Sequence, residues 1–167
     1  LGALLDTVSF SGLGFVGPIA CARDAVNDRI LLTFYDSGTL NSAVFGISCV
    51  TLSPTPVEVI SLTGSAGSPV DCLTIDPTDP TKLWVVFDGV GGTLNNPCYL
   101  AKVNRSTGAV ISENVLMQVA QGITFLNGDC YMSSDAEFHL SVPDGNRVWK
   151  LNPNTGGEIV GAPVLVK

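Results

Sequence analysis

The feature that most constrains the fold of this chain is an internal repeat with a period near fifty residues. Gly17-Pro18-Ile19-Ala20-Cys21 matches Ser68-Pro69-Val70-Asp71-Cys72, with both prolines and both cysteines 51 positions apart. A further step of 51 from Pro69 reaches Ala120, at the start of a third similar segment. Each start leads into short β-branched and aromatic runs that are separated by Gly, Pro, Asn and Asp. The repeat therefore predicts three small units built from strands and turns.

Each unit contains four predicted strands, the first of which follows directly from the matched segment. The second, third and fourth strands are predicted at 30–36, 43–50 and 57–62, then at 83–88, 99–104 and 109–112, then at 130–135, 147–152 and 158–160. Four strands per unit at this period are typical of a β-propeller blade. We predict an all-β fold of three consecutive four-stranded antiparallel blades in an incomplete ring. The alternative is a β-sandwich made of similar hairpins.

Two predicted turns carry a family resemblance. Val103-Asn104-Arg105-Ser106-Thr107-Gly108 and Leu151-Asn152-Pro153-Asn154-Thr155-Gly156 share the frame apolar-Asn-x-x-Thr-Gly. The Asn side chain can cap such a turn, and the Gly supplies the positive φ that closes the hairpin. This frame resembles the turn between the last two strands of quinoprotein-type and NHL-type propeller repeats. The resemblance implies a fold and no particular activity, and the first unit departs from it at 53–56.

The predicted organisation is a single β-propeller segment that spans residues 1–167. Residues 1–16 are expected to supply the outer strand of a preceding blade, because 7–12 aligns with 59–64. Blades are expected at 17–64, 65–118 and 119–167. Propellers close with about four to eight blades, so three blades cannot complete a ring. The expected partners are therefore further blades of the same chain or copies of the chain.

Charge and hydropathy exclude two classes of partner. Fifteen acidic residues against eight Lys and Arg give a net charge of −7, whereas nucleic-acid binding needs clustered positive charge. Charged residues make up 14% of the chain, below the roughly 25% of ordinary soluble domains. No apolar run approaches the roughly 20 residues that span a bilayer. The composition favours a β-rich protein with large buried faces and an extracellular or virion-surface setting.

The five cysteines leave two interpretations open. No C-x-x-C pair exists among Cys21, Cys49, Cys72, Cys98 and Cys130, so zinc-ribbon and redox motifs are absent from the sequence. Cys21, Cys49 and Cys72 lie in apolar runs, which favours buried thiols. The alternative is one or two disulfides, and Cys49 with Cys98 is the first pair to test.

The candidate metal ligands are Asp36, Asp88 and Asp135, which recur where the second strand of each unit ends. Three carboxylates on one face of a propeller could bind a cation through oxygen ligands. The competing and favoured interpretation is that each Asp hydrogen-bonds the following turn. Asp71, Asp76 and Asp79 are close in sequence and could suggest calcium, but the spacing of an EF-hand is absent and turn formation is favoured.

No catalytic constellation is found in the sequence. His139 is the single histidine, and no G-x-S-x-G segment exists to place a nucleophile. We therefore expect no catalysis and no cofactor. The predicted function is a non-catalytic structural and protein-interaction scaffold within a larger extracellular or virion-type assembly. The alternatives are a carbohydrate-binding propeller or a fragment of a quinoprotein-like or lactonase-like propeller enzyme.

Overall fold

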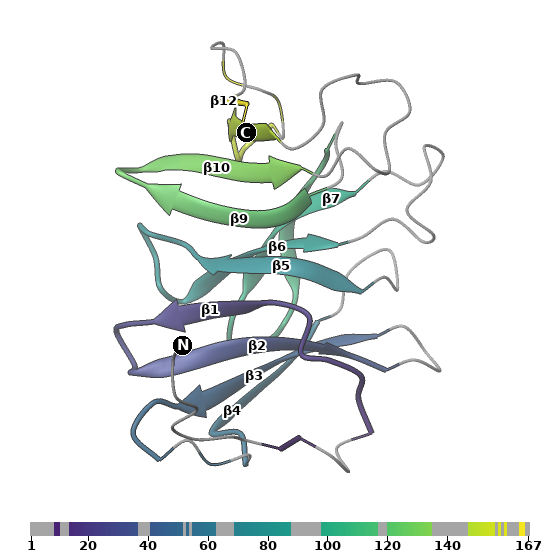
Figure 1. Cartoon of the computed structure of the whole chain (residues 1–167), viewed down its shortest axis with the longest axis vertical. Coiled ribbons are helices and arrows are strands. Elements are labelled where there is room, and N and C mark those ends of the chain that lie inside the picture. Colours follow the sequence, from purple (N-terminus) through teal and green to yellow (C-terminus); the bar gives the residue numbers. More distant parts are fainter. Residues whose placement is uncertain are drawn as a thin grey trace, which may run out of the picture.

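The computed structural model is all-β in the part of the chain that it describes (Figure 1). It describes residues 9–10, 14–36, 41–51, 53, 55–62, 69–87, 98–116, 120–134, 147–155, 157, 159 and 164–165. No helix that could cross a membrane occurs among these residues. The predicted fold class is confirmed: the strands form three separate antiparallel sheets of four strands each.

Each sheet is a simple meander in which consecutive strands pair. The first sheet contains β1 (Cys21–Asp24), β2 (Arg29–Tyr35), β3 (Ser42–Ser48) and β4 (Glu58–Leu62). The second contains β5 (Val70–Ile75), β6 (Lys82–Phe87), β7 (Tyr99–Asn104) and β8 (Val110–Val115). The third contains β9 (Ala120–Leu126), β10 (Asp129–Ser134), β11 (Arg147–Leu151) and β12 (Val164–Leu165).

The last strand of the third sheet lies later in the chain than the sequence predicts. We expected it at 158–160, but β12 pairs with β11 through Val164 and Leu165. Ile159 belongs to no strand, although its backbone N–H donates to the Lys150 carbonyl at 2.8 Å. Of the three residues that suggested a strand, Ile159 lies in the described part of the chain, and it contacts β11 through this bond without belonging to a strand.

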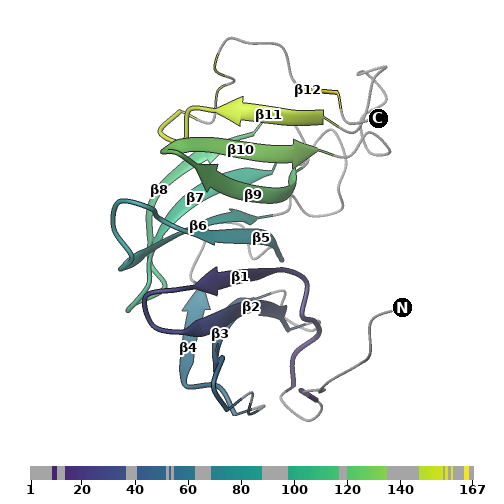
Figure 2. The same ribbon diagram turned by 60° about the vertical axis from the view of Figure 1, so that its left-hand side comes forward.

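The three sheets follow one another along an arc (Figures 1 and 2). Their first strands, β1, β5 and β9, lie side by side, and the later strands of each sheet extend away from them. This is the relation between the inner strands of neighbouring propeller blades. Within the described residues the arc does not close into a ring.

Apolar cores fill the spaces between the sheets. One core, between the first and second sheets, contains Leu31, Val44, Ile60, Leu62, Val70, Leu73, Leu83, Val85, Phe87, Ala101 and Val103. A second core, between the second and third sheets, contains Cys72, Trp84, Val86, Cys98, Leu100, Leu116, Ala120, Ile123, Cys130, Met132, Trp149 and Leu151. The middle sheet is thus buried on both faces, which explains why β6 is a nearly continuous apolar run rather than an alternating one.

A third core covers the outward face of the first sheet. Phe34 and Phe45 pack against each other there, with ring centroids 4.7 Å apart. Phe10 packs on Phe34 at 5.2 Å, and Phe15 meets Phe45 edge-on at 5.5 Å. Residues N-terminal to β1 therefore occupy the face that a preceding blade would cover. The predicted outer strand at 7–12 lies mostly outside the described residues, and the blade boundaries at 17–64, 65–118 and 119–167 stay a prediction.

Candidate functional site

The candidate site lies at one end of the first two sheets, where the turns after their first and third strands meet. The turn from β1 to β2, the turn from β5 to β6 and the turn from β7 to β8 all lie at this end, because neighbouring strands run antiparallel. Asp36, which follows β2, lies at the opposite end of the first sheet. The charged side chains described below all belong to the first of these two ends.

Two buried aspartates fold the turns that follow the first strands. Asp24 is fully buried and accepts hydrogen bonds from the backbone N–H groups of Val26 and Asn27, at 3.2 and 3.1 Å. Asp76 occupies the same position in the second sheet and accepts from the backbone N–H groups of Thr78 and Asp79, at 2.9 and 3.2 Å. These are Asx turns, in which a side-chain carboxylate replaces a backbone acceptor. The predicted turn role of Asp76 is therefore present in the structure.

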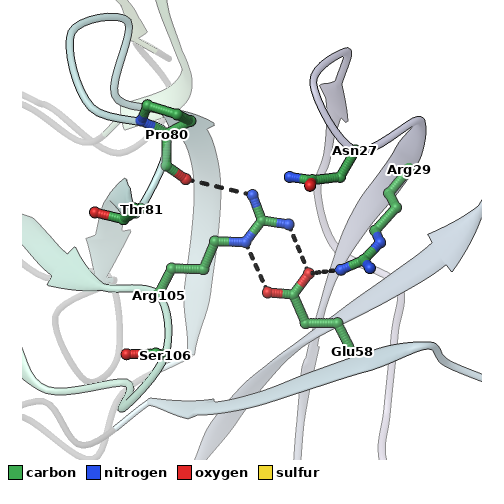
Figure 3. A pocket seen from close by; sticks show the side chains of 7 residues that line it. All are labelled: Asn27, Arg29, Glu58, Pro80, Thr81, Arg105 and Ser106. Atoms are coloured by element: carbon green, nitrogen blue, oxygen red, sulfur yellow. Dashed lines mark hydrogen bonds and ion pairs between the residues drawn. The ribbon is translucent and has the colours of Figure 1, made fainter.

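Arg105 joins the first two sheets. It comes from the turn between β7 and β8 of the second sheet and reaches the first sheet, where it binds Glu58 and Asp24. Its Nε donates to Glu58 Oε1 and its Nη2 to Glu58 Oε2, both at 2.6 Å, in a two-pronged contact (Figure 3). The same Nη2 lies 2.6 Å from Asp24 Oδ2. Arg29 adds a third ion pair, from its Nη1 to Glu58 Oε2 at 2.6 Å.

These contacts shift the protonation equilibria of the acidic partners. Burial by itself raises the pKa of Asp24, but hydrogen bonds from Asn27 and Arg105 outweigh it and hold the pKa below its ordinary value. Hydrogen bonds from Arg105 lower the pKa of Glu58 against the opposing effect of burial. The pKa of Arg105 is raised in return, chiefly by its bond to Glu58. The cluster therefore holds the carboxylates of Asp24 and Glu58, both ionised at neutral pH, beside the guanidinium groups of Arg105 and Arg29.

A glycine on β3 makes room for the Glu58 side chain. Gly46 pairs with Glu58 across the sheet, and a Cβ on Gly46 would lie 2.9 Å from the Glu58 Cβ. Any larger side chain at position 46 would displace the carboxylate that receives Arg105. Lys102 holds the matching position in the second sheet, and it forms an ion pair with Asp76 of the same sheet.

In the second sheet, the buried Asp76 is paired by side chains of the same sheet. Lys102 on β7 places its Nζ 2.6 Å from Asp76 Oδ2, and Trp84 Nε1 donates to the same oxygen at 3.1 Å. The Lys102 Nζ also lies 5.1 Å from the centre of the Trp84 ring, within cation–π range. Burial raises the pKa of Asp76, but the bonds from Lys102 and Thr78 outweigh it and lower the pKa overall.

A pocket of about 270 Å³ opens beside the Arg105 cluster (Figure 3). It is lined by Asn27, Arg29, Glu58, Pro80, Thr81, Arg105 and Ser106. Arg105 Nη1 donates to the Pro80 carbonyl at 3.4 Å, so each of the three guanidinium nitrogens has a partner within the protein. Because the charges of the cluster cancel, the arrangement is suited to tying two sheets together and has no excess charge to attract an ionic ligand.

Of the three candidate metal ligands, only Asp36 lies within the described residues. Asp36 follows β2, and its backbone N–H donates to the Asn41 carbonyl at 2.9 Å. Asp88 and Asp135 lie outside the described residues, as does His139. No group of three or more His, Cys, Asp or Glu side chains in the described part of the chain could hold a metal ion.

The disulfide suggested between Cys49 and Cys98 is absent from the structure. Cys49 is half-buried just beyond β3, where its backbone N–H donates to the Asp28 carbonyl at 3.0 Å. Cys98 is buried between the second and third sheets, with Cys72 and Cys130 in the same core. Burial raises the pKa of Cys72 strongly and that of Cys130 to about 12, so these thiols are protonated at neutral pH.

Sequence reasoning missed Glu58 and Arg105 as a pair. They are 47 residues apart and belong to different sheets, so no local spacing joins them. One signal was present: Arg105 is a charged residue inside the Asn-x-x-Thr-Gly turn frame, where the third unit has Pro153. The two residues make different contacts: the Arg105 side chain reaches the neighbouring sheet, whereas Pro153 contributes only its backbone carbonyl, which accepts from Asn114 Nδ2 at 3.3 Å.

No protein-family model matches the chain, and no curated protein sequence matches it. Solved structures that resemble its fold include the following three. A putative oxidoreductase (glucose dehydrogenase) from Thermus thermophilus aligns over 90% of the chain with a TM-score of 0.54 and 14% identity. The WD40 domain of Neurospora crassa Pan2 aligns over 88% with a TM-score of 0.51 and 8% identity. Hydrazine synthase of Kuenenia stuttgartiensis aligns over 98% with a TM-score of 0.51 and 9% identity.

These likenesses concern the fold alone. WD40 repeats form β-propeller blades, and the likeness to one supports the three sheets as blades of that type. The chain spans about half of each of the three matched structures, at 46%, 49% and 53% of their lengths.

Proposed function

We propose that this chain is a non-catalytic β-propeller module that acts as a structural and protein-interaction scaffold in a larger assembly. The observation that carries the proposal is the outward face of the third blade. In the first and second blades, the face toward the next blade is buried. In the third blade, the same face is partly open and forms a shallow hollow.

The repeat makes this comparison position by position. Trp84 in the second blade is 3% exposed because the third blade covers it. Tyr131 holds the matching place in the third blade, opposite Lys150 as Trp84 is opposite Lys102, and it is only half-buried. Thr124 beside it is exposed. A face that this fold uses for packing is thus left available to a partner.

The hollow on this face, named the terminal hollow, has a volume of about 270 Å³. It is lined by Gly122, Ile123, Thr124, Tyr131, Ser133 and Val148. The proposed partner on this face is a further blade, supplied either by more of the chain or by a copy of it. The acidic, charge-poor composition supports an extracellular or virion-type assembly as the setting.

Light scattering on the 167-residue chain tests the scaffold proposal. We expect a mass that is a multiple of 17.4 kDa at raised concentration. The substitution Tyr131→Arg should return the chain to a monomer, because a charge would be buried without a partner. Ile111→Arg, at an exposed site on β8, is the matched control and should leave the mass unchanged. A monomer at every concentration would contradict a copy of the chain as the source of the further blade.

A second candidate function is carbohydrate binding in the terminal hollow. Tyr131 offers an aromatic ring, and Thr124 and Ser133 offer hydroxyl groups around it. An aromatic platform with a few polar groups is a common arrangement for a small polar ligand. A glycan array probed with the wild-type chain and Tyr131→Ala decides this point: binding that Tyr131→Ala abolishes supports it, and an array without hits removes it.

A further inference from the structure

The turn after the first strand is built differently in the third blade. In the first two blades a buried aspartate folds this turn, but in the third blade Leu126 holds that position and is 60% exposed. Only Asn127 and Gly128 connect β9 to β10. Their φ angles are 54° and 86°, the left-handed values that a two-residue hairpin turn requires. Both residues are exposed, so the turn projects into solvent.

We propose that Asn127 is a site of spontaneous deamidation in the folded protein. The backbone nitrogen of Gly128 attacks the Asn127 side-chain carbonyl carbon, a new C–N bond closes a succinimide ring, and the side-chain nitrogen leaves as ammonia. Water then opens the ring to aspartate or isoaspartate. The reaction is a hydrolysis overall and needs only water as co-reactant.

Two features of the turn favour this reaction. Gly128 has no side chain to obstruct ring closure, and a Cβ placed there would meet no atom within 4 Å. The neighbourhood of the attacking nitrogen is therefore open. In addition, no hydrogen bond to another described residue holds the Asn127 side chain, so its carbonyl carbon can approach the backbone.

The other asparagines in turns of the described residues are held or obstructed. Asn27 donates from Nδ2 to Asp24 at 2.8 Å and precedes a residue with a side chain, Asp28. Asn104 accepts from the Ser106 N–H and hydroxyl at 2.9 and 2.8 Å. Such bonds keep the side chain folded over its own turn.

Two further asparagines lie in the last described turn of the third blade. Asn152 accepts from the Asn154 N–H at 3.0 Å. Asn154 is exposed, but the residue after it is the β-branched Thr155. The structure thus singles out Asn127 among the asparagines in these turns.

The product would change the third blade locally. A carboxylate at position 127 would stand two residues from Asp129, whose Oδ2 lies 2.6 Å from the Lys150 Nζ. Isoaspartate would also add one methylene to the backbone of a two-residue turn, which fixes the pairing of β9 with β10. Deamidation is therefore expected to loosen the hairpin that forms one edge of the terminal hollow.

Peptide mapping by mass spectrometry tests this proposal on the intact chain during incubation in mildly alkaline buffer. We expect the amide-to-acid mass change at Asn127 to accumulate at least about tenfold faster than at Asn27 or Asn154, and isoaspartyl methyltransferase to label the product. Asn127→Gln is the matched variant, because a glutamine would have to close a larger ring, and it should remove the label.

A parallel incubation in urea separates the folded turn from the dipeptide alone. Equal rates at Asn127, Asn27 and Asn154 in the folded chain would overturn the proposal. So would modification of Asn127 that is fast in urea and undetectable in buffer, since the native turn would then be protective.

Discussion

Replacing Arg105 by methionine tests whether its ion pairs hold the first two blades together. Arg105 is 7% exposed and Asp24 is fully buried, so the substitution leaves a buried carboxylate without its cation. Removing one partner of a buried ion pair costs roughly 3–5 kcal/mol. Asp24 keeps its bonds from Val26 and Asn27, and Glu58 keeps Arg29, so we expect the low end, about 3 kcal/mol.

Urea unfolding followed by tryptophan fluorescence measures this loss as a lower transition midpoint with an unchanged slope. The control is Arg23→Met, which removes the ion pair between Arg23 and Asp28. The side chains of Arg23 and Asp28 are 64% and 54% exposed. Such a pair contributes at most about 1 kcal/mol. Combining Arg105→Met with Asp24→Asn should recover part of the loss, since no unpaired charge then remains at that position. The reasoning fails if Arg105→Met costs no more than Arg23→Met.

Three further predictions concern pH, backbone and thiols. Asp24 and Glu58, the acidic partners of Arg105, have lowered pKa values in the folded state. Their ionised forms therefore stabilise the folded protein above the ordinary carboxyl range, and this stabilisation is lost as the pH falls through the folded-state pKa values. Acid titration of stability should therefore show a steep loss below about pH 4 that is smaller in Arg105→Met. Gly108→Ala should lower the free energy of unfolding by well over 1 kcal/mol, because φ is 72° and the new Cβ would overlap the Ser61 carbonyl. In Gly128→Ala the new Cβ meets no atom, so the substitution should cost only the backbone strain, about 1 kcal/mol. Equal urea midpoints for the two variants would contradict this prediction. In the native protein Cys21 should react first with a thiol reagent, because it is exposed, and the three cysteines of the second core should react only on unfolding; early labelling of those three would contradict the packing.

The repeat predicted the fold class because strand identity depends on local residue types. Runs such as the one at 83–88 are β-branched and aromatic, and turn residues limit them on both sides, so their conformation follows from short-range preferences. The fourth strand of the third unit could not be placed this way. The runs at 158–160 and at Val164–Leu165 are both short and contain apolar residues, so local residue types do not distinguish them, whereas the structure shows Val164 and Leu165 paired with β11.

The register of the repeat was harder to obtain than its period. The sequence aligned Cys21 with Cys72, yet Cys21 is exposed and Cys72 is buried. Counted from the capping aspartates, Cys21 lies three residues before Asp24 and Cys72 lies four before Asp76. Because side chains alternate along a strand, one residue of difference turns them to opposite faces. A bulge between Val70 and Cys72 absorbs the extra residue, and no sequence pattern predicts it.

The candidate site could not be predicted for a different reason: the side chains around the turn after the first strand differ from blade to blade. The first blade keeps Gly46, so Glu58 fits and Arg105 arrives from the neighbouring blade. The second blade places Lys102 at the matching position and pairs its own aspartate. The third blade has Leu126 in place of the aspartate and needs no cation. The blades therefore share a turn at this position, but the side chains around it differ, and in the first blade one of them comes from the neighbouring blade. It follows that the blades are not interchangeable: Gly46→Lys would copy the second blade's residue, but it would displace Glu58 and leave Arg105 with Asp24 as its only carboxylate partner among the residues described above.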